Sequence, residues 1–221
     1  MKRYICSIVS ILAIFMMLVL SAFLLCYVAP NWWEHEYTKH NSLAYVNREI
    51  SMEEAVKVTD EMFDRFLWNR KSFESITVPD HDKQVPFFTE REISHLEDIR
   101  DIIHKILWFS AFAILAIVLG FMKYKKTAAR PFQRTAIACL VLFAIVVIVC
   151  MIDFDWAFDS FHKLLFDNDN WILNPFEDDL VNLMRIGVLR DTAVAIGAVF
   201  MTLVAASTAA VTLCIANREN Q

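Results

Sequence analysis

A histidine lies among aromatic and acidic residues in the segment 153–179, which reads DFDWAFDSFHKLLFDNDNWILNPFEDD. His162 follows Asp159 and precedes a run of acids and amides at 167–170. An imidazole that titrates near neutral pH, placed beside carboxylates and amides, suits acid–base chemistry at a reaction centre. The alternative is an aromatic belt at a membrane interface, in which His162 is only a hydrogen-bonded helix residue.

A second histidine, His95, lies in the segment FTEREISHLEDIRDI, residues 88–102. Glu92 and Asp98 are three positions before and after it, so a helix would place both carboxylates on its face. Either acid could orient or charge the imidazole. The alternative is an exposed helix face with ordinary ion pairs. We predict that His95 and His162 converge in one pocket, with rings within about 8 Å of each other.

No nucleophile motif accompanies these histidines. The chain has no G-x-S-x-G, H-E-x-x-H, P-loop or G-x-G-x-x-G pattern. Ser94 adjoins His95, and Ser160 lies two positions before His162. Residues one or two positions apart do not face each other on a helix, so both serines are interpreted as structural.

Four windows without a charged residue are long enough to cross a membrane and so to position such a site at its surface. They are Tyr4 to Trp33, Ile106 to Met122, Thr135 to Ile152 and Thr192 to Asn217. A helix needs roughly 17–25 apolar residues to cross the hydrocarbon core. The chain is 57% hydrophobic and has only 3 glycines. These features predict an all-α membrane protein, with four transmembrane helices and a small, mostly helical extracellular cap.

Basic residues predict the orientation of the four spans. Lys2 and Arg3 precede the first span, Arg218 follows the fourth, and Lys125 and Lys126 lie in the basic link between the second and third. Positive residues favour the cytoplasm. The predicted order is cytoplasmic 1–3, span 4–29, extracellular 30–105, span 106–122, cytoplasmic 123–134, span 135–152, extracellular 153–191, span 192–216 and cytoplasmic 217–221.

The two extracellular regions hold 25 of the 26 acidic residues. This external acidity argues against nucleic acid as a partner. Within the first region, Ser51 with Glu54 and Thr89 with Glu92 form capping-box patterns, which predict helix starts. Residues 77–86 between these helices, bounded by prolines, are predicted to form a turn region. In the second region we expect a short helix through His162, which Asn174-Pro175 ends, and another from about 176 to 190.

With these residues in view, the chain resembles the Lit family, the lipoprotein intramolecular transacylases of Gram-positive bacteria. The segment around His95 is similar to the family's E-x-x-H-[LM]-x-D-[VI] element. The segment FHKLLFDNDNWILNPFEDDL is similar to its F-H-x-x-F-F-x-N-D-x-W-x-L-[ND]-P element. The chain departs from the family before the last span, where Leu183-Met184-Arg185-Ile186 replaces a Phe-Pro.

The resemblance implies a plasma-membrane enzyme that moves the sn-2 acyl chain of a diacylated bacterial lipoprotein to the α-amino group of its lipid-bearing cysteine, giving a lyso-form lipoprotein. It implies His95 and His162 as the catalytic residues on the extracellular face. It implies Asp98, Asn168, Asp169, Trp171 and Asp178 as supporting residues. Asp98 and Asp169 are the candidates for orienting the imidazoles. No cofactor or metal is expected, and membrane lipid surrounds the substrate.

Ester aminolysis needs a neutral amine, a stabilised oxyanion and a proton for the leaving oxygen. One histidine could serve as the base, and a second, protonated one as the acid or the oxyanion donor. Two other function classes stay open at this point. One is a metal-dependent membrane hydrolase that uses the histidines and nearby acids as ligands. The other is a non-catalytic partner protein with an acidic cap.

Overall fold

The computed structural model describes residues 2–68, 71–124 and 129–219. Lys125 and Lys126 of the predicted cytoplasmic link, with the chain ends Met1, Asn220 and Gln221, lie outside the described residues. The chain divides into two compact units. Met1–Val28, Leu107–Phe154 and Ala193–Gln221 are called the membrane unit, and Ala29–Ile106 with Asp155–Thr192 the polar unit.

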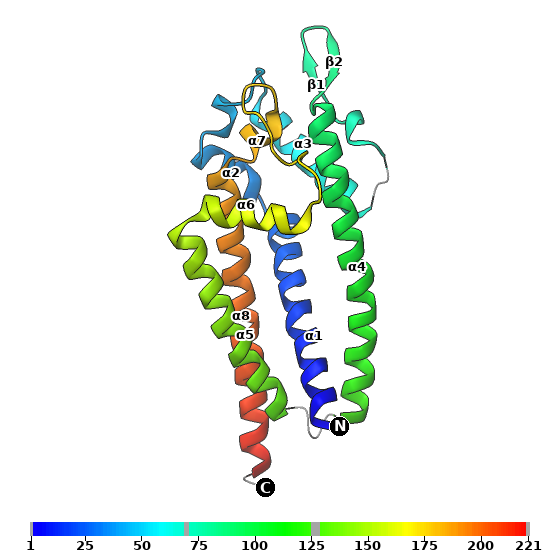
Figure 1. Ribbon diagram of the computed structural model, residues 1–221, viewed down its shortest axis with the longest axis vertical. Coiled ribbons are helices and arrows are strands. Elements are labelled where there is room, and N and C mark those ends of the chain that lie inside the picture. The colour runs from blue at the N-terminus through cyan, green and yellow to red at the C-terminus, as the bar shows by residue number, and fades with distance from the viewer. Residues whose placement is uncertain (1, 69–70, 125–128, 220–221) are drawn as a thin grey trace. The chain divides into compact units, whose positions relative to one another are not determined.

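The described residues include four helices long and apolar enough to cross a membrane: Tyr4–Val28, Glu90–Tyr124, Ala129–Cys150 and Ile186–Leu213. They correspond to α1 (Lys2–Phe23) with the π-helical turn η1 (Leu24–Val28), α4 (Glu90–Tyr124), α5 (Ala129–Ile152) and α8 (Ile186–Glu219) (Figure 1). The prediction of a helical membrane protein with four spans is thereby confirmed.

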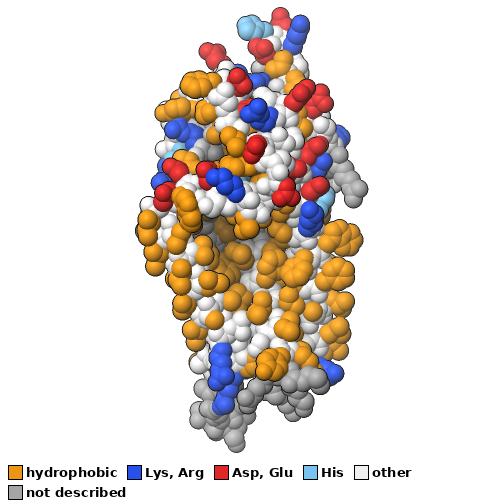
Figure 2. All heavy atoms as spheres, viewed as in Figure 1, with side chains coloured by type: hydrophobic (Ala, Val, Ile, Leu, Met, Phe, Trp, Pro, Cys, Tyr) orange, Lys and Arg blue, Asp and Glu red, His pale blue; other side chains and the backbone are white. Residues whose placement is uncertain are grey.

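Helix α1 contacts the other three helices within the membrane unit. Ile14 of α1 forms a buried cluster with Ala136 of α5 and with Phe200 and Val204 of α8. Phe15 meets Phe109 of α4 edge to face, with ring centroids 5.2 Å apart. Hydrophobic side chains cover the visible face of this unit in Figure 2. Such a surface favours lipid as its surroundings, because water would penalise so large an apolar area.

The polar unit contains mostly short elements. They are α2 (Trp32–Lys39), η2 (Ser42–Ala44), α3 (Met52–Leu67), η3 (Phe73–Ser75), β1 (Thr77–Asp80), β2 (Lys83–Pro86), the first turns of α4, α6 (Phe154–Leu165), α7 (Asp179–Leu183) and the start of α8. Charged side chains gather on the visible face of this unit (Figure 2). Aromatic side chains form part of its core, including Trp33 stacked on Phe63 at a centroid distance of 5.0 Å.

Both predicted capping boxes form. The Ser51 hydroxyl accepts the Glu54 N–H, and the Glu54 carboxylate accepts the Ser51 N–H at 2.7 Å, so α3 begins where expected. At α4, the Glu92 carboxylate accepts the Thr89 N–H at 2.6 Å, and the Thr89 hydroxyl accepts the Glu92 N–H at 3.3 Å. These bonds satisfy helix N–H groups that otherwise lack partners.

The sequence interpretation was wrong at three places in the polar unit. Residues 77–86 form an antiparallel hairpin, in which His81 adopts φ 55° at the turn. The helix through His162 ends at Leu165, well before Pro175. The expected helix over 176–190 is interrupted, because Met184 leaves helical geometry with ψ 50° and α8 begins only at Ile186.

Candidate active site

His95 lies on the second turn of α4, and the capping box fixes where that helix begins. Its side chain is buried within the polar unit. Its Nδ1 atom has no hydrogen-bond partner among the described residues. Thr89 and Glu92 fix the residue at which α4 begins. Because His95 lies on the second turn of that helix, the same bonds set the place of its imidazole.

His162 lies in the last turns of α6 and is also buried. Its Nδ1 is 2.8 Å from the Phe158 carbonyl oxygen, one helical turn earlier. A carbonyl oxygen only accepts, so Nδ1 must carry the hydrogen that is donated. In the neutral imidazole, Nε2 therefore carries the lone pair and is free to accept a proton.

The two imidazoles lie side by side inside a group of aromatic rings. Their ring centroids are 5.8 Å apart, inside the predicted limit of about 8 Å. Phe166 contacts both rings, at 5.0 Å from His95 and 5.6 Å from His162. Trp171 lies 5.0 Å from His162, and Phe158 lies 4.1 Å from it. The aromatic rings limit the access of water to the pair.

Burial lowers the pKa of both histidines and so favours their neutral forms. Desolvation is the first cause that lowers the pKa of His95, to about 4, followed by the neighbouring His162, while Asp98 acts in the opposite direction. Desolvation also lowers the pKa of His162, against the opposing effects of the Phe158 carbonyl and Asp159. A pair of neutral imidazoles can offer a lone pair from one ring and an N–H from the other.

The loop after α6 docks along one face of α4. Asn168 donates its side-chain amide to Asp98 at 2.9 Å, and Asn170 donates to the Ser94 hydroxyl at 2.9 Å. One turn earlier, Arg91 donates to the Ile172 carbonyl at 3.3 Å. The anchor points on α4 are three or four residues apart, as one helix face requires. These contacts fix the loop that carries Trp171.

The predicted supporting residues differ in where they lie. Trp171 contacts His162 directly, whereas Asp98 acts on His95 by charge and hydrogen-bonds to Asn168. Asp169 is exposed, and among the described residues its carboxylate forms no hydrogen bond with either imidazole. Within the described part of the chain, neither Asp98 nor Asp169 forms a group of three close metal-ligand atoms with the two imidazoles.

Asp178 holds the loop to the start of α4. Its carboxylate accepts the Thr89 hydroxyl at 2.7 Å and the Asn174 N–H at 2.7 Å. Glu92 completes this connection by accepting the Leu180 N–H. Desolvation is the largest effect on Glu92 and raises its pKa to about 7, although the N–H groups of Thr89 and Leu180 oppose it.

Sequence reasoning missed the partner of Asp179. The Asp179 carboxylate is almost fully buried. It accepts the Arg48 Nε–H at 2.6 Å and the Asn47 N–H at 2.7 Å. Arg48 also lies over the Phe87 ring. No local pattern indicates this pair, since 131 positions separate the two residues.

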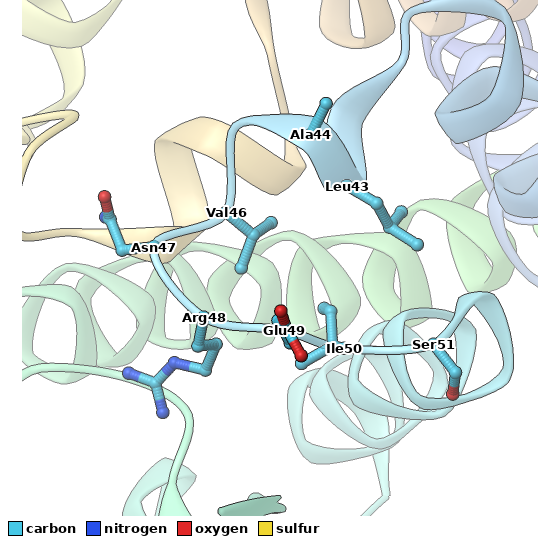
Figure 3. Close-up of a pocket in the computed structure, with 8 residues that line it drawn as sticks. All are labelled: Leu43, Ala44, Val46, Asn47, Arg48, Glu49, Ile50 and Ser51. Atoms are coloured by element: carbon cyan, nitrogen blue, oxygen red, sulfur yellow. The ribbon is translucent and has the colours of Figure 1, made fainter.

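A surface concavity of about 570 Å³ lies in the polar unit, and Asn47 and Arg48 are part of its lining (Figure 3). Its lining comes from Leu43, Ala44 and the stretch 46–51, and includes neither histidine. Arg48 in this stretch is already paired with Asp179. The concavity thus offers no positioned acid–base pair, and the aromatic-enclosed histidines remain the better candidate for chemistry.

Comparisons with known proteins agree with this geometry. The sequence model of the family "Lipoprotein intramolecular transacylase Lit" matches residues 7–186. A solved structure of the membrane-integral lipoprotein intramolecular transacylase Lit from Bacillus cereus has 18% identity and a TM-score of 0.80, with 100% of this chain and 99% of that chain covered. The curated proteins gave no match.

Two further structures of that Bacillus cereus protein carry a substitution at one histidine. The first has 18% identity and a TM-score of 0.76, covering 100% of this chain and 96% of that chain. The second has 20% identity and a TM-score of 0.73, covering 100% and 95%. At these identities the likeness shows a shared fold.

Proposed function

This chain belongs to the lipoprotein intramolecular transacylase family Lit, and from that premise we propose that it moves the sn-2 acyl chain of a diacylglyceryl-cysteine lipoprotein to the α-amino group of the same cysteine. Membership of the family makes the protein a membrane acyltransferase that acylates the amino group of a lipoprotein. The metal-dependent hydrolase and the non-catalytic partner protein are therefore not retained. The product of the proposed reaction is a lyso-form lipoprotein.

The observation that carries the proposal is the contact between two buried, neutral imidazoles. In the proposed reaction the amine nitrogen attacks the ester carbonyl carbon and forms the new amide bond. The ester C–O bond then breaks, and the glycerol oxygen leaves. One proton must travel from the nitrogen to that oxygen, so a single base that later returns the proton balances the reaction.

We assign the proton transfer to His162. Its Nδ1–H is held by the Phe158 carbonyl, which leaves the Nε2 lone pair for the substrate amine. The protonated ring then gives the proton to the leaving glycerol oxygen. This assignment replaces a permanently protonated acid with one imidazole that alternates between base and acid, because burial disfavours the charged form of either histidine at rest.

His95 is assigned to the oxyanion. A neutral imidazole N–H, placed against the carbonyl oxygen as it gains charge, stabilises the tetrahedral intermediate without an enzyme cation. The surrounding rings of Phe166 and Trp171 keep the region poor in water, which strengthens that hydrogen bond. Removal of such a donor typically costs about 10²–10³ in rate.

The transfer is direct and forms no acyl-enzyme. Ser94 accepts a hydrogen bond from Asn170, which gives this hydroxyl a structural role. The attacking amine has a pKa near 7.7–8.0, so about a tenth or more is already neutral at pH 7. Amine and ester also belong to one molecule, and such positioning contributes up to about 7–11 kcal/mol in oriented intramolecular reactions.

We place the site on the extracellular face, where the acyl chains of the substrate stay in the outer leaflet. The basic bias of the predicted cytoplasmic segments supports this orientation. The outer face of α6 also supports a membrane-interface position, since Trp156 is 59% exposed, Phe161 56% and Leu164 83%. Aromatic and aliphatic side chains of this kind suit the headgroup boundary.

The test is expression in a bacterial host that makes diacyl lipoproteins and lacks N-acylation of its own. Mass spectrometry of a purified reporter lipoprotein should detect the N-acyl, S-monoacylglyceryl form, with total acyl content unchanged. Fragmentation distinguishes the amide-linked chain from the ester-linked one. A reporter that stays diacylglyceryl-modified with a free α-amine, although the enzyme is present in the membrane, would contradict the proposal.

A further inference from the structure

A second group of titratable side chains lies in the polar unit and shares no residue with the histidine pair. Glu36 and His40 are one turn apart on α2, and Asp191 lies near the start of α8. His40 Nε2 is 2.7 Å from Asp191 Oδ2 and 3.4 Å from Glu36 Oε2. One ligand atom from each residue lies within 4.8 Å of the other two. Imidazole nitrogen and carboxylate oxygen are the donors that Zn²⁺ accepts.

The Glu36 carboxylate provides the second observation. Its side chain is only 2% exposed, and its Oε2 atom is buried without a hydrogen-bond partner among the described residues. That atom faces His40 Nε2, at a distance longer than a well-formed hydrogen bond to a ring nitrogen. A buried carboxylate oxygen without a donor is costly, and a cation bound by the same three residues would satisfy it.

The fold also fixes the imidazole of His40 in place. Gly187 of α8 packs against this ring, where a Cβ atom would lie 2.6 Å from the ring carbon Cε1. At the other end of α2, the Trp32 indole N–H donates to the Thr192 hydroxyl at 3.2 Å. Helix α2 is thus attached to the first turns of α8 at both its ends, and the ring is held by packing as well as by charge.

Three further charged or titratable groups surround the cluster. Lys39 Nζ is 2.7 Å from Asp191 Oδ2 and 3.9 Å from Glu36 Oε1. Arg190 Nε is 3.3 Å from Asp191 Oδ1, and His35 Nε2 is 3.9 Å from Glu36 Oε1. The Lys39 side chain is about half exposed, so its ammonium can move into solvent when a cation takes its place beside Asp191 and Glu36.

We propose that Glu36, His40 and Asp191 bind a first-row divalent cation of the Zn²⁺ class, at a structural site separate from the catalytic histidines. Zn²⁺ ligands at about 2.0–2.2 Å in tetrahedral geometry lie roughly 3.3 Å from one another. The 3.4 Å distance from His40 to Glu36 already fits. The 2.7 Å distance from His40 to Asp191 must lengthen by about half an ångström, while Lys39 turns away from Asp191.

The bound ion would join α2 to α8 in place of the Lys39 contact. Two carboxylates and one neutral imidazole leave a coordination position for water, and no substrate needs to enter. Binding to the folded state alone would stabilise the polar unit by mass action. Because the cluster contains neither His95 nor His162, the ion takes no part in acyl transfer.

The experiment uses the full-length, tag-free protein in detergent after treatment with a chelator. ZnCl₂ is titrated against a chromophoric competitor, and thermal unfolding is recorded with and without Zn²⁺. The expected result is saturable binding of a single equivalent and a higher Tm in Zn²⁺. Glu36→Gln and Asp191→Asn should each weaken binding by about tenfold or more and remove the rise in Tm, since even outer-shell partners matter on that scale.

Matched variants on the same helix separate a metal site from an ion-pair cluster. His35→Ala removes an exposed histidine outside the three ligands and should leave the Zn²⁺ affinity unchanged. Lys39→Ala removes the competing ammonium and should keep or increase that affinity. Absence of saturable binding by the native sequence would overturn the proposal. So would Glu36→Gln and Asp191→Asn variants, folded by circular dichroism, that bind Zn²⁺ as tightly as the native chain.

Discussion

At the scale of single residues, the proposed acyl transfer depends on which nitrogen of each histidine carries a proton. His162→Ala and His95→Ala should each lower the rate of lyso-form production by roughly 10²–10⁴-fold, the usual contribution of a positioned acid, base or donor. The measurement is the ratio of lyso-form to diacyl reporter by mass spectrometry, at equal enzyme levels in the membrane. His104→Ala, elsewhere on α4, is the matched control. Retention of more than about a tenth of the activity by either variant would contradict a catalytic role.

The direct route makes a separate prediction about Ser94. Its hydroxyl accepts a hydrogen bond from Asn170, a structural contact, so Ser94→Ala should keep most of the activity. Mass spectrometry of the enzyme, quenched during turnover, should detect no increase by one fatty acyl group. An acylated peptide containing Ser94 or Ser160, or a folded Ser94→Ala variant as inactive as His162→Ala, would establish a covalent intermediate instead.

The pH dependence follows from the same residues. The pKa values of both imidazoles lie below the ordinary 6.5, so both are neutral at pH 7 and become protonated only as the pH falls further. The substrate amine, with a pKa near 7.7–8.0, becomes neutral as the pH rises. The rate should therefore rise almost tenfold per pH unit from about pH 6.5 and level off above about pH 8. A fall in rate between pH 7 and 9 would indicate a histidine that must be protonated.

At the scale of elements, buried acids hold the site together. Arg48→Met leaves the nearly fully buried Asp179 with the Asn47 N–H as its one remaining donor among the described residues. Because the Arg48 side chain is 31% exposed, we expect a moderate loss of about 1–3 kcal/mol, seen as a lower Tm in detergent. Lys163→Ala breaks a solvent-exposed contact with Asp159 and should change stability by less than about 0.5 kcal/mol. Equal effects of the two variants would refute this role of Arg48.

The same elements show what the sequence can predict. The capping boxes at Ser51 and Thr89 are local patterns, and both helices begin there. The hairpin at 77–86 was missed because its turn uses His81 in a left-handed conformation, where glycine or asparagine is the usual signal. Helix α2 was missed because its eight residues are too few for a clear hydrophobic period.

Contacts between distant residues are harder to predict. Each histidine lies near a helix that adjoins a span at the same predicted membrane face, which indicated that His95 and His162 would meet, and they do. Arg48 and Asp179, like His40 and Asp191, lie more than 100 positions apart, so no local pattern indicates either contact. The role of Asp98 was only partly foreseen: it affects His95 through charge, while its hydrogen bond goes to Asn168.

At the scale of the whole molecule, the orientation in the membrane decides whether the site can meet its substrate. The positive-inside rule predicts that both termini and the basic link after α4 lie in the cytoplasm, and that His95 and His162 lie outside. Truncation fusions to a reporter active only outside the cell should therefore be active at His81 and Asn170 and inactive at Ala128. A reporter active only in the cytoplasm should give the opposite pattern.

The fusions at His81 and Asn170 also distinguish two ways in which the predicted topology could fail. His81 lies in the hairpin that precedes the second span, and Asn170 lies in the loop that follows the third span and contacts Ser94. Each fusion therefore reports the location of one of the two predicted extracellular regions. Activity of the cytoplasmic reporter at Asn170 alone would mean that the third span does not cross, and His162 could not meet His95 on one face. Activity of that reporter at both positions would place the pair in the cytoplasm, where a substrate anchored in the outer leaflet could not reach it.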